Sequence, residues 1–395
     1  MPGSVIVAGA RTPIGKLSGG LSGFSAMELG GFAIAAALER AGVRPEEVDY
    51  VVMGQVLQAG QGQITARQAA VKAGIPMTVP ATTVNKVCLS GLNSIYLADQ
   101  MVASGDAEIV VAGGMESMTA APHLLEGARA GFRIGDATLV DSMMHDGLSC
   151  AFDECAMGLA AERYNREVGI DRERQDNLAA SSHERAAAAI KDGRLAEEII
   201  PVSVPQRRGD PIVIDTDEGV RPGTTPESLG QLKPAFEKDG TVTAGNASQI
   251  SDGGAAVVVM SEAKARERGA PRLGEFLSYG QVAGPDPSLL TQPARATRRA
   301  LERAGKKISD VDLFEINEAF AVVGLASMDD LGITDDVVNV NGGAIALGHP
   351  IGMSGTRLAL TLLHELRRRG GGLGMATLCG GGGQGDALLV RAEPS

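Results

Sequence analysis

The stretch that decides the fold is residues 37–52, ALERAGVRPEEVDYVV, because a second copy follows at residues 300–315, ALERAGKKISDVDLFE. Each copy is typical of a helix end, a glycine at the C-cap, a turn with acidic residues and then a strand. A second pair of blocks matches further along, where Ser90-Gly91 and Ser354-Gly355 each open a predicted helix that leads into a strand. The two pairs are offset by 263 and 264 residues. This agreement favours a duplicated α/β unit.

Each copy alternates predicted strands and helices, which indicates a mainly parallel sheet covered by helices. Apolar runs such as VIVAGA, YVVMG, IVVAGG, AAVVVM and LFEIN are typical of buried strands. Between about 120 and 248 the rhythm is broken by charged helical stretches and Pro-rich turns, which indicates an insertion into the first half. We therefore expect an N-terminal half from 1–119 plus 249–271, an inserted loop domain from 120–248, and a C-terminal half from 272–395.

The charge and the cysteine content exclude several classes of protein. A net charge of −12 argues against a nucleic-acid partner, which requires a basic face. Four cysteines in 395 residues are too few for a disulfide framework, and Cys150 and Cys155 lack a histidine pair of zinc-site spacing. The N-terminus does not resemble a signal peptide, and no apolar segment has membrane-spanning length. We expect a cytoplasmic protein with reduced thiols, no metal and no membrane partner.

Cys88 lies in NKVCLSG, just before an amphipathic stretch that ends at Gly105. Free backbone N–H groups and the dipole at a helix N-terminus stabilise a thiolate, which makes cysteine a usable nucleophile at neutral pH. A single cysteine is more often buried and inert. The catalytic interpretation therefore depends on partners elsewhere in the chain.

Three such partners lie at the ends of predicted elements in the second half. His349 lies on a tight turn in GHPIG, and Asn317 follows a strand in INEAF. Cys379 follows a buried strand and precedes four glycines, whose backbone can approach a ligand closely. Taken singly, each has an ordinary structural explanation. If the two halves pack about a pseudo-twofold axis, these side chains and Cys88 converge on one site.

Seven segments, taken together and in order, resemble the thiolase family over essentially the whole chain: ARTPIG, NKVCLSG, AGGMESM, TAGNASQISDG, INEAFA, NGGAIALGHPIGMSG and CGGGGQGDA. The resemblance is strongest to the acetyl-CoA acetyltransferases. It implies an α/β thiolase fold, in which two similar βαβ-type halves form a five-layered α-β-α-β-α arrangement with an inserted loop domain. It also implies a reversible, ping-pong condensation of two acetyl-CoA to acetoacetyl-CoA, with CoA as substrate or product and no permanently bound cofactor.

The resemblance also assigns roles to the candidate residues. Cys88 would carry the acyl group and His349 would activate it, while Cys379 would act as acid and base. Asn317, through a water, and His349 would form one oxyanion hole. The backbone N–H groups of Cys88 and Gly381 would form the other. Each such donor is typically worth about 2.7–4 kcal/mol of transition-state stabilisation.

By the same resemblance, residues of the insertion and of the second half would hold CoA. These residues are Leu148, Met157, Arg221, Ser228, Phe236, Ala244, Ser248, Ala319 and Phe320. Arg221 would be the cation on the phosphate side, although a lone surface arginine is equally well explained as a solvated charge. Arg129 and Arg133 lie in GARAGFRIG, which is similar to the tetramer-forming loop of the family. We therefore expect a homotetramer.

One departure from the family pattern leaves the acyl-chain range open. Ala156 stands before Met157, where short-chain biosynthetic thiolases commonly have histidine. The nearest alternative is thus a broader 3-ketoacyl-CoA thiolase of fatty-acid breakdown. A ketoacyl synthase would not need Cys379 or the CoA-holding insertion, and an inactive acyl-CoA carrier would lack one of the reactive residues.

Overall fold

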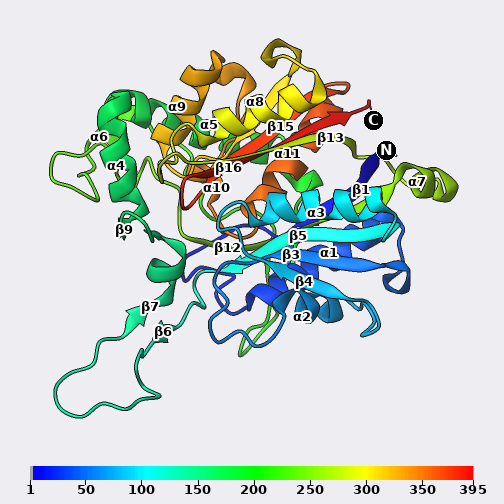
Figure 1. Cartoon of the computed structure of the whole chain (residues 1–395), viewed down its shortest axis with the longest axis horizontal. Helices are drawn as coiled ribbons and strands as arrows, with labels where there is room; N and C mark the ends of the chain where they lie inside the picture. The colour runs from blue at the N-terminus through cyan, green and yellow to red at the C-terminus, as the bar shows by residue number, and fades with distance from the viewer. Residues whose placement is uncertain (1–2, 395) are drawn as a thin grey trace.

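The computed structural model describes residues 3–394, and the first half of the chain forms one part of a large sheet (Figure 1). The spatial order of its main strands is β4 (Ala81–Val84), β3 (Tyr50–Gly54), β5 (Ile109–Ser117), β12 (Ser251–Ser261) and β1 (Ser4–Arg11). Three helices belong to this half: α1 (Ala26–Ala41), α2 (Thr65–Lys72) and α3 (Ser90–Ser104). The strand after the insertion, β12, pairs with both β1 and β5, so the chain returns to the sheet it left.

The second half repeats this order. Its strands lie as β14 (Leu313–Ile316), β15 (Gly372–Gly380), β16 (Gln384–Ala392) and β13 (Gly274–Ala283), and β13 pairs briefly with β1 to join the two half-sheets. Its helices are α8 (Gln292–Ala304), α9 (Ala321–Leu331), α10 (Ala344–Leu347) and α11 (Ser354–Arg368). The matched sequence blocks correspond to α1 followed by β3 and to α8 followed by β14. Gly42 and Gly305 cap α1 and α8 with the same left-handed φ of 63°.

The prediction of a mainly parallel sheet was wrong. Strands pair in parallel in β3–β4, β3–β5 and β14–β15, whereas β1–β12, β5–β12, β13–β16 and β15–β16 are antiparallel. The reason differs between the halves. A tight turn at Gly381–Gly383 folds β16 back on β15 as a hairpin. The long insertion lets β12 re-enter the sheet against β5 from the opposite direction.

Helices α3 and α11 pack on each other between the two half-sheets, in a buried cluster to which strands of both halves contribute. They cross at glycines. A Cβ on Gly91 would lie 3.0 Å from the Thr356 nitrogen, and one on Gly355 would lie 2.3 Å from the Leu92 nitrogen. The contact is reciprocal, as expected of a pseudo-twofold axis. It brings the N-termini of the two helices together, and Cys88 precedes α3 while His349 precedes α11.

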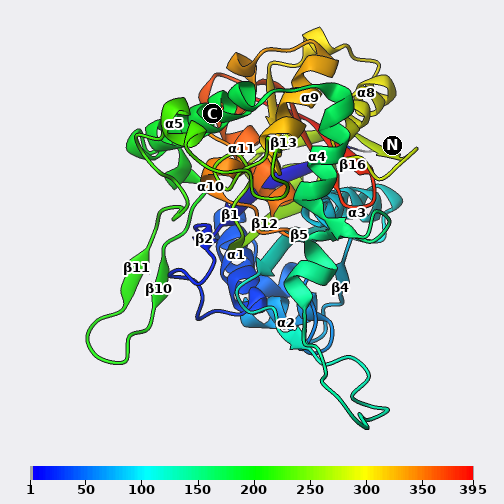
Figure 2. The same ribbon diagram turned by 90° about the vertical axis from the view of Figure 1, so that its left-hand side faces the viewer.

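Residues between β5 and β12 form helices and two projecting hairpins (Figure 2). The helices are α4 (Met157–Val168), α5 (Arg172–Lys191) and α6 (Pro226–Gly230). The short strands are β6 (His123–Leu124), β7 (Val140–Asp141), β8 (Ser149–Cys150), β9 (Cys155–Ala156), β10 (Val202–Val204) and β11 (Ile212–Ile214). The arm between β6 and β7 exposes Phe132, Ile134 and Leu139.

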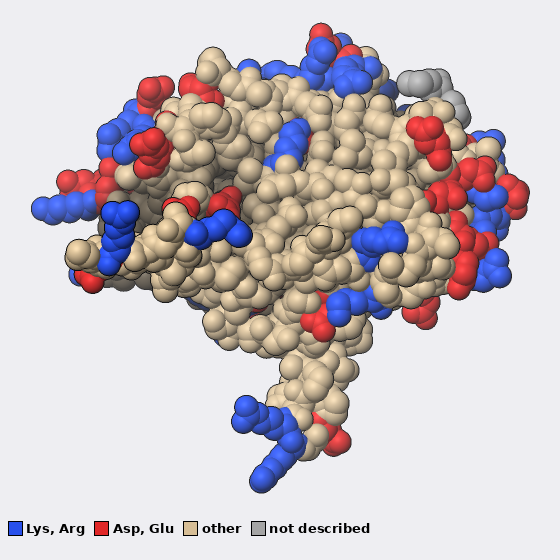
Figure 3. Space-filling view, turned by 60° about the horizontal axis from the view of Figure 1, so that its bottom comes forward, with Lys and Arg blue, Asp and Glu red and all other residues tan. Residues whose placement is uncertain are grey.

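Strand β2 (Gly15–Lys16) pairs with β12, and α7 (Glu262–Arg268) follows β12. Short 3₁₀ turns lie at Pro45–Glu47, Leu195–Glu197, Ile308–Asp310 and Asp335–Val337, and a π-helical turn lies at Met143–Gly147. In Figure 3, basic and acidic side chains are interspersed around the face shown, with a largely uncharged centre. No helix within residues 3–394 is long and apolar enough to cross a membrane.

Candidate active site

Cys88 lies in the turn between β4 and α3, two residues before the helix begins. The turn is strained, because Val87 has φ of 50°, a left-handed conformation that is an outlier for a β-branched residue. Two side chains hold it. Asn85 Oδ1 accepts the Val87 N–H at 3.0 Å, and Ser90 Oγ accepts the Lys86 N–H at 2.8 Å while donating to the Val87 carbonyl at 2.6 Å. The helix start thus fixes the direction of Cys88.

The Cys88 thiol faces the backbone N–H groups of Cys88 itself and of Gly381. These two groups lower its pKa, but burial has the larger effect and, together with the charge of Glu116, raises the pKa to about 12. The sequence predicted a thiolate stabilised by the helix N-terminus. In the structure the free thiol is protonated at neutral pH, because desolvation outweighs the two N–H groups. The nucleophile therefore needs a base that takes its proton.

His349 is held in the tautomer that such a base requires. Its Nδ1 lies 2.5 Å from Ser354 Oγ, and this hydroxyl donates its own proton to the Pro350 carbonyl at 2.8 Å. Ser354 Oγ therefore accepts from Nδ1–H, which leaves the lone pair on Nε2. Burial, followed by the charge of Arg357, lowers the pKa of His349 to about 4. The imidazole is thus neutral at pH 7, with an unprotonated Nε2.

Asn317 follows β14 and points its amide at His349. Its Nδ2 lies 3.4 Å from His349 Nε2, and its backbone N–H donates to the Thr377 carbonyl at 3.1 Å. Its Oδ1 is buried and has no hydrogen-bond partner within residues 3–394. A buried carbonyl oxygen without a partner is costly unless a water pairs with it. The predicted water-mediated oxyanion hole would use this oxygen.

Cys379 is the second-to-last residue of β15, and its side chain is fully buried. Burial raises its pKa far above the ordinary range, and the neighbouring charge of Cys88 raises it further. The charge of Cys88 therefore influences the ionisation of Cys379. A cavity of about 540 Å³ opens onto Cys88, Val87, Met157 and Gly381. Cys379 lies outside the lining of this cavity.

A second cavity of about 230 Å³ collects other predicted CoA contacts, because Arg221, Ser228 and Ala244 all line it. The remaining predicted contacts lie outside the linings of both cavities but contact the site or one another. Leu148 and Cys88 pack against the same buried cluster, and the Phe236 and Phe320 rings meet edge to face at 6.3 Å. The Ser248 N–H donates to the Ala319 carbonyl at 3.0 Å.

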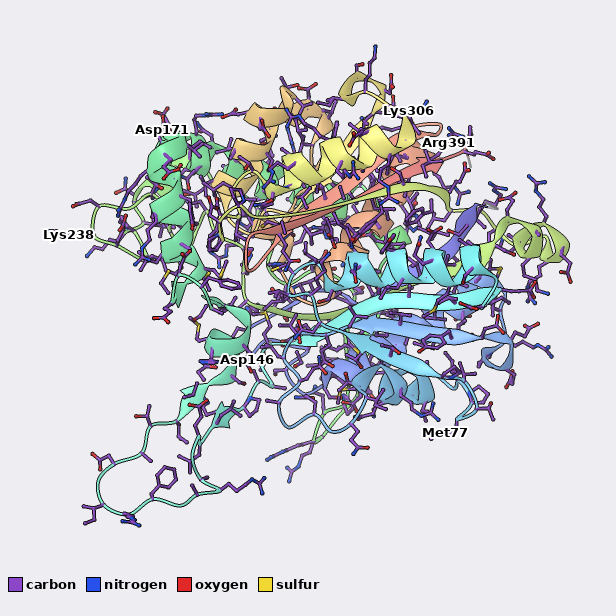
Figure 4. The ribbon with its side chains drawn as sticks, in the orientation of Figure 1. Met77, Asp146, Asp171, Lys238, Lys306 and Arg391 are labelled. Carbon is purple, nitrogen blue, oxygen red and sulfur yellow. The ribbon has the colours of Figure 1, made fainter. Side chains whose placement is uncertain are left out.

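The sequence did not reveal three residues that lie in these cavities or near Cys88. His183 lines the smaller cavity, and its Nδ1 accepts the Arg221 N–H at 3.1 Å. Asp146 lies where the β6–β7 arm joins the body and lines the larger cavity (Figure 4). Glu116 is fully buried near Cys88. None of the three has a local sequence that indicates a site, although Glu116 lies in AGGMESM, one of the segments that carry the family resemblance. Within residues 3–394, no cluster of three or more His, Cys, Asp or Glu is placed to hold a metal.

Comparison with known proteins agrees with this geometry. Residues 4–263 match the family described as "Thiolase, N-terminal domain", and residues 270–392 match "Thiolase, C-terminal domain". The chain is 57% identical over 392 residues to a "Probable acetyl-CoA acetyltransferase" of Mycobacterium tuberculosis, which covers 99% of this chain and 100% of that protein. It is 56% identical to an "Acetyl-CoA acetyltransferase" of Cupriavidus necator and 54% identical to one of Pseudomonas aeruginosa, each over 390 residues, 98% of this chain and 99% of the relative.

Proposed function

Because the chain belongs to the thiolase family, we propose that it is an acetyl-CoA C-acetyltransferase, an acyltransferase that reversibly condenses two acetyl-CoA to acetoacetyl-CoA and CoA. One observation carries the proposal: Cys88 of the first half and Gly381 of the second half line the same cavity, and Cys379 lies two residues before Gly381. A nucleophile and a separate acid/base in one site are what a Claisen condensation requires.

In the first half-reaction, Cys88 attacks the acetyl-CoA carbonyl while His349 Nε2 takes the thiol proton. The tetrahedral oxyanion collapses to acetyl-Cys88, and Cys379 gives its proton to the departing CoA thiolate. Two sets of donors would stabilise the oxygen charge. The N–H groups of Cys88 and Gly381 would form one, and His349 with a water held by Asn317 would form the other.

In the second half-reaction, the Cys379 thiolate takes an α-proton from a second acetyl-CoA. The resulting enolate attacks acetyl-Cys88, and collapse expels the Cys88 thiolate, which recovers its proton from His349. Cys88 holds the acyl group during proton abstraction, so the base has to be a different residue. The raised pKa of Cys379 makes its thiolate a strong base once it has given up its proton.

CoA would lie along the insertion, with Arg221, Ser228 and Ala244 around its outer part and Met157 near the reacting end. A cation in the outer cavity suits a phosphorylated ligand of an otherwise acidic protein. The nine predicted CoA contacts thus remain a proposal supported by their grouping in and beside two cavities. CoA serves as substrate and product.

The domain division and the order of layers belong to the same proposal. Clusters around α1 and α2, around α3 and α11, and around α8 and α9 support five layers, α-β-α-β-α. The pairing of β12 with β5 supports an insertion between them. The exposed arm that carries Arg129 and Arg133 supports assembly into a homotetramer. A cytoplasmic location is kept as an expectation.

The test is a comparison of thiolysis rates on acetoacetyl-CoA and on a long-chain 3-ketoacyl-CoA. We expect a clear preference for acetoacetyl-CoA and a stable acetyl group on Cys88 by mass spectrometry when CoA is withheld. A preference for the long chain would instead assign the broader 3-ketoacyl-CoA thiolase activity. Acetylation that persists in Cys88→Ala would remove Cys88 from the mechanism.

A further inference from the structure

An ion pair joins the two halves directly behind the reactive cysteines. Lys86 Nζ lies 2.7 Å from Asp386 Oδ1 and 2.9 Å from Oδ2, although the residues are 300 positions apart in sequence. Lys86 comes two residues before Cys88. Asp386 lies on β16 opposite Leu378, and its neighbour Gly385 lies opposite Cys379. The pair therefore connects the turn that carries the nucleophile to the hairpin that carries the second thiol.

On the second-half side, Asp386 is rigidly held. Its side chain is fully buried, and Oδ2 also accepts the Tyr279 hydroxyl at 2.8 Å. Its backbone carbonyl accepts Thr377 Oγ1 at 3.0 Å. Burial raises the pKa of Asp386, and the charge and hydrogen bonds of Lys86 oppose this. Without Lys86, the carboxylate would be a buried charge without a cationic partner, which is strongly unfavourable.

On the first-half side, Lys86 belongs to the strained turn described above. Val87 keeps its left-handed φ of 50°, a conformation that persists only where the surroundings determine it. The Val87 side chain lies next to Gly381, since a Cβ on Gly381 would be 3.5 Å from Val87 Cγ1. The ion pair of Lys86 thus holds Val87 next to Gly381, whose N–H faces the Cys88 sulfur.

The pair does not act on Cys88 through its charge. The groups that shift the Cys88 pKa are burial, its own N–H, the Gly381 N–H and Glu116, and Lys86 is not among them. The carboxylate of Asp386 neutralises the ammonium at hydrogen-bond distance. The pair therefore acts through geometry, because it sets the distance between the turn that carries Cys88 and the β15–β16 turn.

We propose that Lys86 and Asp386 are positioning residues, which fix the separation between Cys88 of one half and Gly381 and Cys379 of the other. This rests on the proposed thiolase function of the same site. The inference predicts that breaking the pair lowers the rate of the chemical steps while leaving CoA binding and the ionisation of Cys88 unchanged.

The experiment compares Lys86→Met, Asp386→Asn and Lys86→Arg in acetoacetyl-CoA thiolysis. Lys86→Met should lower kcat by roughly 10- to 100-fold, since a misplacement of about 1 Å can cost about 10²-fold. The KM for CoA should change by less than about threefold, because the CoA-lining residues are untouched. Lys86→Arg restores the cation and should recover most of kcat. Arg268→Gln is the matched control, because it breaks a 2.7 Å ion pair with Glu47 outside the site and should leave kcat unchanged.

Alkylation of Cys88 by iodoacetamide across a pH series is the second readout, and it needs no thiolase activity. The midpoint of the rate profile should be the same in wild type and Lys86→Met. An upward shift of the midpoint would show that Lys86 acts by charge, and a wild-type kcat in Lys86→Met would show that the pair is dispensable; either result overturns the proposal. Should Lys86→Met fail to fold, Asp386→Asn supplies the kcat and midpoint comparison, since it removes the charge but keeps the shape. Loss of thiolysis in wild type would contradict the proposed function while leaving the alkylation result interpretable.

Discussion

The imidazole of His349 is buried beside Ser354, and its pKa is lowered from 6.5 to about 4. The folded value lies below the ordinary one. The neutral ring therefore contributes stability that is present above about pH 6.5 and is lost as the pH falls through about 4. In ¹⁵N-histidine NMR spectra we expect the His349 Nε2 resonance to stay constant between pH 5.5 and 8. His349→Asn assigns the signal, and a midpoint between pH 6 and 7 would contradict the assigned environment.

Cys88 and Cys379 have the same side chain but different proposed roles. Replacing Cys379 should therefore separate the acetylation of Cys88 from the condensation step. In Cys379→Ala we expect acetyl-Cys88 to form while acetoacetyl-CoA synthesis falls by about 10²- to 10⁴-fold, the usual range for loss of an acid/base. Intact-protein mass spectrometry follows the first step and a coupled CoA assay the second. Retained condensation would point to decarboxylative, synthase-like chemistry instead.

The four candidate side chains, Cys88, Asn317, His349 and Cys379, could be singled out from sequence, because each lies at the end of an element next to glycine or a turn. The positions of Glu116 and His183 in the site could not be predicted in this way. A glutamate at the end of a strand and a histidine on a charged helix give no local signal, and their importance comes from burial. The ionisation of Cys88 was mispredicted for the same reason, since desolvation depends on the whole fold.

The capping glycines of α1 and α8 allow a prediction at the scale of single elements. Gly42 and Gly305 share a φ of 63°, and a Cβ on either would meet no atom within 4 Å. Alanine therefore costs only backbone strain, about 1–2 kcal/mol. We expect Gly42→Ala and Gly305→Ala to lower the free energy of unfolding in urea by similar amounts. Gly23→Ala is the control, because that site is equally open and has no positive φ; unequal losses would show that the two caps are not equivalent.

Element types and boundaries followed well from apolar runs and capping glycines, whereas strand direction did not. The whole insertion separates β5 from β12, so the sequence of neither strand indicates the direction in which β12 runs. For β15 and β16 the signal was present, since four glycines between two apolar runs permit a hairpin. The alternation of strands and helices had instead predicted a mainly parallel sheet, whereas β15 and β16 are antiparallel.

At the scale of the whole molecule, Glu116 bridges the halves. Its carboxylate accepts N–H groups from Val56 and Leu57 of the first half and from Gly352 of the second, at 3.0–3.1 Å. Burial raises its pKa from 4.5 to about 7, with the neighbouring charge of Asp252 adding to the rise. Stability linked to this group is therefore fully present below pH 4.5 and lost as the pH rises through about 7.

Glu116→Gln removes that titration. Measured by urea unfolding, the stability of the variant relative to wild type should rise between pH 5 and pH 8, by up to about 3 kcal/mol for a pKa change of this size. At every pH the variant also loses part of the three N–H bonds, so the slope rather than the offset is the readout. A difference that stays flat with pH would place the carboxylate outside the titration.

The duplication was readable from sequence because two blocks recur at nearly equal offsets. The contact between the copies was not, since it depends on the reciprocal approach of Gly91 and Gly355 in the folded protein. The sequence indicated that the two halves are similar. Only the structure shows that α3 and α11 pack on each other in a core to which both halves contribute.

The brief pairing of Val5 and Ile6 with Glu275 and Gly274 has a consequence for a chain that holds both halves in one polypeptide. Without the other half, each half-sheet would end in an uncovered strand edge, and the apolar faces of α3 and α11 would lose their mutual cover. Holding both halves in one polypeptide keeps this edge and these faces covered.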